Sequence, residues 1–281
     1  MDDGYGILSQ EDGLVVRQVT QHLESVAQTV GVPYERKNKY KVSALPFGKH
    51  VAQSPSDPQR WKPTSVELEA LDKMLIVKEE SGMFNRLITT ICGCSNARAL
   101  ELNFMVDPNS GNVFVVRRDF RCGGCIGCPW VMNGFENQGG KMVQIGRVRE
   151  DFDDYYDRCF DCCCKCTYYH HIETKQPGNE TFEKAYRLRA SLCVCGRVNN
   201  CCGGTCCKND QVFDILDKDD EVVAHIQRTY GPGPGACCRC CYMFNNYILK
   251  FPSDSSPEER ILILTSIFQM DYQLFEKGGE N

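Results

Sequence analysis

A short apolar helix near the C-terminus constrains the fold more than any other feature. Residues 257–276 read PEERILILTSIFQMDYQLFE; Ser256 is a suitable N-cap and Pro257 fits the first turn. A helix that is apolar on every face is buried in protein or in a membrane. The uncharged run 261–270 has ten residues, and a bilayer span needs ~20. We therefore predict the central, buried axis of a soluble barrel, with core residues Ile261, Leu264, Ile267 and Phe268. The alternative is a segment inserted into a membrane.

The region before this helix shows period-two alternation, which is typical of strands. Two hairpins are predicted, over 100–120 with a turn at 107–111 and over 211–230 with a turn at 217–220. Further strands are predicted over these ranges: 71–80, 141–151 and 183–194. Short strands with regular turns and no helices between them indicate a mainly β protein, an antiparallel sandwich or barrel.

The first 65 residues differ in composition from the rest of the chain. They hold five prolines among Gln, Ser, Lys and Asp, although residues 18–30 could form a short helix. This composition predicts a flexible polar arm over 1–65, through which protein partners could bind. The barrel domain is predicted over 66–281, with its helix at 257–276.

Cysteine is concentrated in the middle of the chain. All 20 cysteines of the 281 residues fall between Cys92 and Cys241. The N-terminus MDDGYGILSQEDGLVV has acids where a secretory signal is basic, and it has no apolar core. We therefore expect a chain that is not secreted and whose thiols are reduced. Metal binding, lipid attachment or plain packing would then explain the cysteines.

The first cluster follows an apolar strand and three arginines. It is RCGGCIGCP, with Cys122, Cys125 and Cys128 as candidate palmitoylation sites. Nearby cations favour thiolate and attract anionic lipid head groups, and both effects suit S-acylation. Zinc is the alternative, because Cys-x-x-Cys twice over supplies three of four ligands.

A second cluster precedes His170 and His171. Its members are candidates for metal binding or further acylation: Cys159, Cys162, Cys163, Cys164 and Cys166. A Cys–His pair for nucleophilic catalysis is a third hypothesis. Further groups lie at 193–207 and 237–241. None of the groups has the repeated ligand spacing of a zinc finger.

Residues from about 71 to 276 resemble the phospholipid scramblase family. The matching pieces occur in order: the loop Arg121–Cys128, the paired cysteines before 207, the hairpin VFDILDKDDEVVAHI, and FPSD before an apolar helix that ends in MDYQLFE. The resemblance implies a closed, twelve-stranded antiparallel barrel around the C-terminal helix, similar to the tubby C-terminal domain. It also implies ATP-independent, calcium-activated phospholipid movement between bilayer leaflets, and a palmitate anchor on the cysteine loop.

The calcium segment that the resemblance implies maps to residues 243–254. Met243 and Asn245 stand where the family has acids. The remaining oxygen ligands would come from Asn245, Asn246, Ser253 and Asp254. Because Ca²⁺ prefers several carboxylates, we expect a weak site and lipid movement that does not respond to cytosolic calcium. The alternative is that Asp254 only precedes the helix and binds no metal.

Two function classes follow from these patterns. The first is a scramblase-type protein without a catalytic constellation, lipid-anchored at the cytoplasmic face of the plasma membrane, with membrane phospholipids as partners. The second is a soluble module that binds zinc or undergoes redox chemistry through its cysteines. The formal net charge of −5 does not favour nucleic acid as a partner.

Overall fold

We describe the computed structural model over residues 4–19, 38–80, 99–120, 129–152, 167–176, 178–191, 210–229 and 245–275. It contains twelve strands. They are β1 (Gly13–Gln18), β2 (Lys39–Ala44), β3 (Leu75–Glu80), β4 (Leu100–Met105), β5 (Phe114–Arg118), β6 (Val131–Gln138), β7 (Lys141–Glu150), β8 (Thr167–Lys175), β9 (Phe182–Ser191), β10 (Gln211–Leu216), β11 (Val222–Thr229) and β12 (Asn246–Lys250). The helical elements are α1 (Gly4–Ser9), α3 (Ser65–Ala70), α6 (Pro257–Met270) and a π-helical turn, η4 (Asp271–Phe275).

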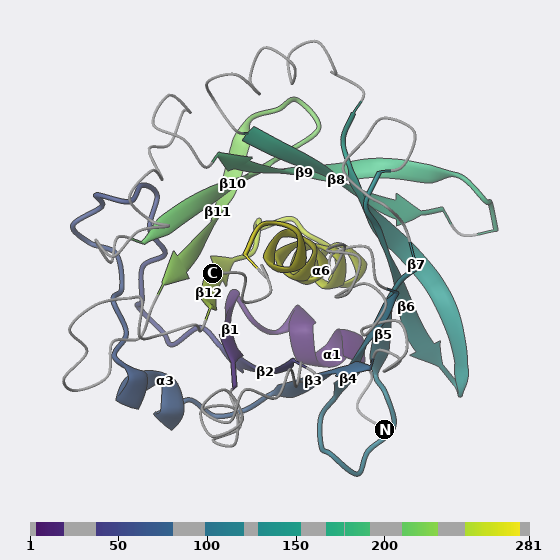
Figure 1. The fold of residues 1–281 in the computed structure, drawn as a ribbon, viewed down its shortest axis with the longest axis horizontal. Coiled ribbons are helices and arrows are strands. Elements are labelled where there is room, and N and C mark those ends of the chain that lie inside the picture. The colour runs from purple at the N-terminus through teal and green to yellow at the C-terminus, as the bar shows by residue number, and fades with distance from the viewer. Residues whose placement is uncertain are drawn as a thin grey trace, which may run out of the picture.

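The strands form one closed antiparallel barrel. Each strand pairs with its neighbours in sequence, and β1 closes the ring against β12. Figure 1 shows this ring with α6 inside it and α3 outside it. Both the mainly β class and the twelve-stranded barrel around the C-terminal helix are confirmed.

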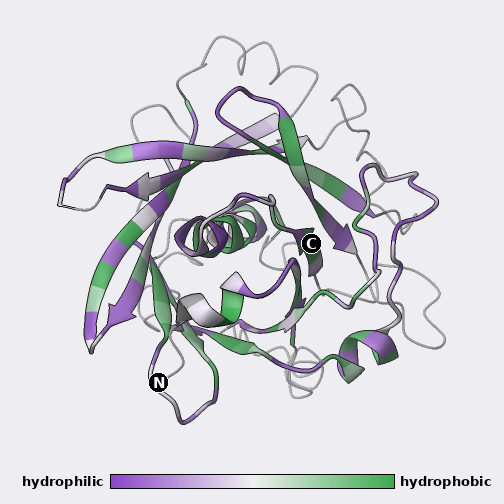
Figure 2. Ribbon diagram, turned by 180° about the vertical axis from the view of Figure 1, so that it is seen from behind, coloured by the Kyte–Doolittle hydropathy of each residue, from purple (hydrophilic) through white to green (hydrophobic). Residues whose placement is uncertain are grey.

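Alternation along the strands builds the core. Figure 2 shows hydrophobic and hydrophilic residues alternating along several strands. Leu14 and Val16 of β1 point inward and are fully buried, as are Tyr40 and Val42 of β2. Side chains on one face of a strand recur at every second residue, so each strand contributes one apolar row to the inside of the barrel.

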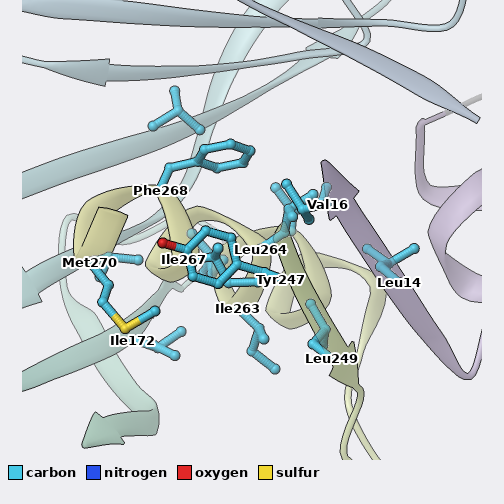
Figure 3. Packing of buried hydrophobic residues seen from close by; sticks show 14 of the residues in the cluster. Leu14, Val16, Ile172, Tyr247, Leu249, Ile263, Leu264, Ile267, Phe268 and Met270 are labelled. Carbon is cyan, nitrogen blue, oxygen red and sulfur yellow. The ribbon is translucent and has the colours of Figure 1, made fainter. Parts of the chain in front are cut away.

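Helix α6 fills the interior that these rows enclose. The four helix residues predicted to be core are completely buried: Ile261, Leu264, Ile267 and Phe268. Figure 3 shows Leu264, Ile267 and Phe268 among inward side chains of β1, β8 and β12. Phe268 also meets the rings of Tyr40 and Phe104 edge-on, with centroids 5.0 and 5.6 Å apart. In the part of the chain that the structure describes, no helix is long and apolar enough to cross a bilayer.

The helix begins where the sequence predicts. Ser256 is the N-cap and Pro257 the first helical residue. The Glu259 backbone N–H donates to Ser256 Oγ, and the Ser256 N–H donates to the Glu259 carboxylate. This reciprocal capping box satisfies two backbone donors that the first turn would leave without partners.

The predicted boundary at residue 65 needs correction, because residues before it belong to the barrel. Strands β1 and β2 are two of the twelve strands of the barrel. Helix α1 packs against α6, and the Arg260 guanidinium donates to the backbone oxygens of Leu8, Ser9 and Glu11. The prediction of a flexible arm is therefore wrong for 4–19 and 38–65, because polar and proline-rich composition did not reveal strand pairing between distant segments. Most of the predicted 18–30 helix lies outside the described residues.

The segment between β2 and β3 covers the outer wall. Its Val51, Trp61 and Leu68 form a second apolar cluster with Val15 of β1 and Ile248 of β12. Outward-facing residues of β1 and β12 are therefore buried as well as inward-facing ones. This segment supports the β1–β12 seam, where the two ends of the barrel sequence meet.

Truncating the buried helix tests this core. We expect Leu264→Ala to lower the free energy of unfolding by about 2–5 kcal/mol, because it leaves a cavity in a close-packed interior. Val66→Ala is the matched control, since Val66 is 64% exposed on α3, and we expect it to change stability by less than about 0.5 kcal/mol. Urea unfolding of the full chain measures both; equal effects would place α6 outside the barrel.

Candidate functional site

The barrel has two chemically different rims. In an antiparallel ring, connections from odd to even strands lie at one end and connections from even to odd strands at the other. We call the first end the cysteine rim and the second the turn rim. Short turns close the turn rim at 106–113, 139–140 and 217–221. The cysteine rim is where β1, β3, β5, β7, β9 and β11 end.

Every cysteine of the chain falls in a connection of the cysteine rim. The five sequence stretches concerned are 81–98, 121–128, 153–166, 192–209 and 230–244. Each follows an odd strand and precedes the next even one. Strand order therefore brings the ends of all five stretches to one end of the barrel. The predicted sites at Cys122, Cys125 and Cys128 lie outside the described residues, as does the cluster Cys159, Cys162, Cys163, Cys164 and Cys166.

The C-terminal end of the helix is fixed at this same rim by a buried carboxylate. Asp271 Oδ1 accepts hydrogen bonds from Tyr247 OH and Asn245 Nδ2, both at 2.6 Å. Its Oδ2 accepts from Tyr40 OH at 2.9 Å. Burial raises the pKa of Asp271 above its usual value, and these three donors oppose that shift. The helix end is thereby tied to β2 and to the start of β12.

Arg228 of β11 extends this network. Its Nε donates to Asn245 Oδ1 at 3.1 Å, and its guanidinium also bonds Gln211 and lies 3.7 Å from the centre of the Phe275 ring. Burial lowers the pKa of Arg228, while the neighbouring Tyr247 and Asp271 raise it. The buried cation thus has hydrogen-bond acceptors and an aromatic face around it, as a desolvated charge requires.

Three more polar contacts surround the helix end. Tyr272 OH donates to Glu79 of β3 at 2.9 Å. Gln273 donates to Glu150 of β7 at 2.8 Å and contacts His170 Nε2 of β8 at 2.6 Å. The residues of η4 therefore contact β2, β3, β7, β8 and β12 through hydrogen bonds at the cysteine-rim end of α6. The other end of α6, at the turn rim, is capped by Ser256.

The structure separates the four predicted calcium ligands. Asn245 and Asn246 lie at the cysteine-rim end of β12, and Ser253 and Asp254 lie beyond its other end. Strands rise ~3.3 Å per residue, so the length of β12 alone separates the two pairs by about 13 Å, whereas the ligands of one Ca²⁺ lie ~2.5 Å from the ion. Asn245 is engaged with Asp271 and Arg228, and Ser253 and Asp254 are exposed. This conformation does not bring the four together around one ion; calcium binding itself stays a prediction.

The two histidines point to opposite sides of the wall. His170 faces inward to Gln273, and His171 faces outward, with Nε2 3.2 Å from Asp151 Oδ1. The cysteines of the predicted Cys–His pair lie outside the described residues. Among the described residues, no three His, Asp or Glu side chains are grouped closely enough to hold a metal ion.

Sequence reasoning missed the Asp271 network. The available signal was a carboxylate directly after ten uncharged helical residues, since an acid that ends a buried helix must find buried donors. Its partners could not be read from the sequence. Tyr40 lies 231 residues before Asp271 in the sequence, and Tyr247 lies 24 residues before it.

A comparison with family models bears on this part of the barrel. The model described as Scramblase matches residues 155–277. The resemblance to the scramblase family is confirmed over these residues. The scramblase match spans β8–β12, α6 and η4, and so includes Asp271 and most of its network. No curated protein and no solved structure matches the chain.

The raised pKa of Asp271 makes a pH prediction. The folded protein holds this proton more tightly than the unfolded chain, whose pKa is near 3.8. This group's contribution to the free energy of unfolding therefore falls as pH rises from the unfolded pKa through the folded one. In Asp271→Asn the amide does not titrate: its oxygen can accept from Tyr247 OH and Asn245 Nδ2, and its nitrogen can donate to the Tyr40 hydroxyl. We expect its stability relative to wild type to increase from pH ~4 to ~8.

Chemical denaturation across that pH range measures the difference between the two proteins. Asp254→Asn is the control, because Asp254 is exposed. Parallel stability–pH curves for wild type and Asp271→Asn would contradict the assignment of a raised pKa to this carboxyl.

Proposed function

We propose that the chain is a peripheral membrane protein of scramblase type, which mediates or supports ATP-independent, bidirectional movement of phospholipids between bilayer leaflets. The cysteine rim faces the cytoplasmic surface of the plasma membrane. The observation that carries the proposal is that all 20 cysteines fall in sequence stretches whose flanking strand ends lie at one rim, on a barrel that includes the scramblase match.

Lipid attachment at this rim would orient the barrel. One acyl chain gives marginal membrane binding, and two give stable binding. Cys122, Cys125 and Cys128 follow Arg117, Arg118 and Arg121 in sequence, and cations beside thiols favour both thiolate and an anionic surface. Palmitate on two of these three cysteines would hold the rim against the bilayer.

The charge of the opposite rim supports this orientation. The turn rim carries acids in its turns and around the start of α6: Asp12, Asp107, Asp217, Asp219, Glu221, Asp254 and Glu258. The cytoplasmic leaflet has a negative surface potential. An acidic rim is therefore better placed in the cytosol than against the membrane.

Phospholipid movement breaks no covalent bond, so the proposal needs no catalytic residues. The barrier is the transfer of a polar head group through hydrocarbon. A barrel anchored through the connection with Cys122, Cys125 and Cys128 could lower this barrier by disturbing the leaflet that it contacts. Calcium, if it binds near Asp254, has one carboxylate in the segment, so we propose affinity no tighter than ~10⁻⁴–10⁻³ M.

Reconstitution tests lipid movement directly. The full chain in vesicles with a fluorescent phospholipid in both leaflets should make the inner-leaflet probe accessible to a reductant that cannot cross the bilayer. We expect faster loss of fluorescence than in empty vesicles, without ATP, and the same rate with micromolar calcium and with chelator. Protein-containing vesicles that behave like empty ones would contradict the proposal.

Removal of the anchor tests the orientation. We expect the triple variant, in which Ala replaces Cys122, Cys125 and Cys128, to move from the membrane fraction to the soluble fraction of the cells, because both acyl chains are lost. Replacement of Cys237, Cys238 and Cys240 by Ala is the matched control. Persistence of the first variant at the membrane, with no hydroxylamine-sensitive acyl group on wild type, would contradict the anchor.

The same samples test the alternative function. A soluble module that binds zinc through its cysteines predicts bound metal in purified wild-type protein and no thioester. Metal analysis of the wild type would therefore favour this alternative if it found stoichiometric zinc together with hydroxylamine-resistant protein.

A further inference from the structure

The outer wall next to the cysteine rim carries a basic patch. Arg17 of β1, Lys39 and Lys41 of β2, and Lys78 of β3 make up this patch. Their strand neighbours Val16, Tyr40, Val42 and Val77 are fully buried in the barrel core. Because successive side chains alternate between faces, the four cations share the outer face of three adjacent strands.

Strand register places these like charges directly opposite one another. Arg17 is the partner of Lys41, and Lys39 is the partner of Lys78. Residues directly opposite in an antiparallel pair have Cβ atoms ~5 Å apart, and like charges at such positions are destabilising. The fold therefore holds two unfavourable pairs side by side on one surface.

Elsewhere on the same wall, several arginines pair with acids on neighbouring strands or connections. Arg117 bonds Glu101 at 2.7 Å, Arg149 lies 3.4 Å from Glu173, and Arg187 lies 2.6 Å from Asp151. Arg189 and His225 both contact Asp214, and they lower the pKa of that carboxyl although its burial would raise it. In β2 and β3, by contrast, Lys39 lies opposite another cation, Lys78.

The lysines of the patch differ from these arginines. Among the described residues, none forms an ion pair with Lys39, Lys41 or Lys78, and only Arg17 has one, at 2.8 Å to Glu69 of α3. The nearest acids on the same face are Glu80, which is exposed at the end of β3, and Glu101, which is bonded to Arg117. Glu79 faces the interior and bonds Tyr272. The patch thus presents a net positive surface.

We propose that this patch binds anionic phospholipid head groups at the bilayer surface. The inference deepens the proposed function and rests on its orientation of the cysteine rim towards the membrane. Lys39 is the first residue of β2 at that rim, and Arg17 and Lys78 lie within the last three residues of β1 and β3. Lysine side chains are long and flexible enough at these positions to contact a surface at the rim, as those of juxtamembrane basic segments do.

Position favours lipid over nucleic acid as the source of the phosphates. The patch lies at the same rim as the connection 119–130, which contains Cys122, Cys125 and Cys128, and the chain as a whole has a formal net charge of −5. A nucleic-acid surface normally belongs to a basic domain. A local cationic patch on an acidic protein instead suits a planar anionic surface that contacts one side of the molecule.

Vesicle sedimentation with the purified, unacylated full chain tests the proposal. Wild type should bind vesicles with about one-third phosphatidylserine more tightly than phosphatidylcholine vesicles, and salt near 1 M should abolish the difference. Each lysine or arginine near the membrane surface raises the affinity for anionic vesicles roughly fivefold. We expect the double variant Lys39→Gln and Lys78→Gln to bind the anionic vesicles roughly 25-fold more weakly.

The control is the double variant Lys141→Gln and Lys250→Gln, which removes the same charge from exposed positions at the turn rim. It should bind within about twofold of wild type. Thermal unfolding should show the Lys39 and Lys78 variant at least as stable as wild type, because a like-charge pair is lost. Equal loss of binding in both variants, or no loss in either, would overturn the patch.

Two further outcomes separate the hypotheses. Binding of a duplex oligonucleotide that depends on Lys39 and Lys78, without binding to anionic vesicles, would overturn the lipid assignment. If the vesicle result holds but reconstituted protein moves no lipid, the patch stands and the proposed scramblase activity fails. If the reconstituted Lys39 and Lys78 variant moves lipid at the wild-type rate and also binds vesicles as tightly as wild type, the proposed activity stands and the lipid-binding patch is wrong.

Discussion

The burial of a helix that is apolar on every side is the constraint on which the rest of the structure depends. A sheet that covers one face of α6 would leave the other faces in water, so the wall must close around it. Ten consecutive helix residues from Ile261 to Met270 are buried, and they pack against the rows of inward side chains of the strands. Closure also removes free strand edges, which would otherwise pair with other chains.

Closure with antiparallel neighbours divides the connections between two rims. The turn rim has short turns and α1, which Arg260 holds against the start of α6. The cysteine rim receives the cysteine-containing connections and the polar end of the helix. Asp271, with its donors Tyr40, Asn245 and Tyr247, ties that end to the wall. The rigid core can thus remain intact while the rim connections differ in length and chemistry.

Much of the fold was predictable because its signals are local. The hairpins at 107–111 and 217–220 have turn residues between alternating strands, and Ser256 and Pro257 mark the helix start. Strands β1, β2, β6, β8 and β12 were not predicted. In β12, NYILK is a five-residue strand within a segment expected to bind calcium, and β1 and β2 lie in a polar, proline-containing region.

The site was less predictable, because its parts meet only through long-range pairing. Strand order is needed before the five cysteine stretches can be assigned to one rim, and register is needed before Lys39 and Lys78 are seen to face each other. Likewise, one carboxylate after an apolar helix indicates buried donors without naming them. The separation of Asn245 and Asn246 from Ser253 and Asp254 has the same cause, since a segment compact in sequence becomes extended once it is a strand.

The central claim is that the cysteine rim, and not the turn rim, meets the membrane. Hydrogen–deuterium exchange of the full chain, with and without anionic vesicles, measures this without any substitution. The account predicts slower exchange on vesicle binding in peptides that contain connections of the cysteine rim, such as 119–130, and unchanged exchange in the turns 106–113 and 217–221. Slower exchange confined to those turns would contradict it.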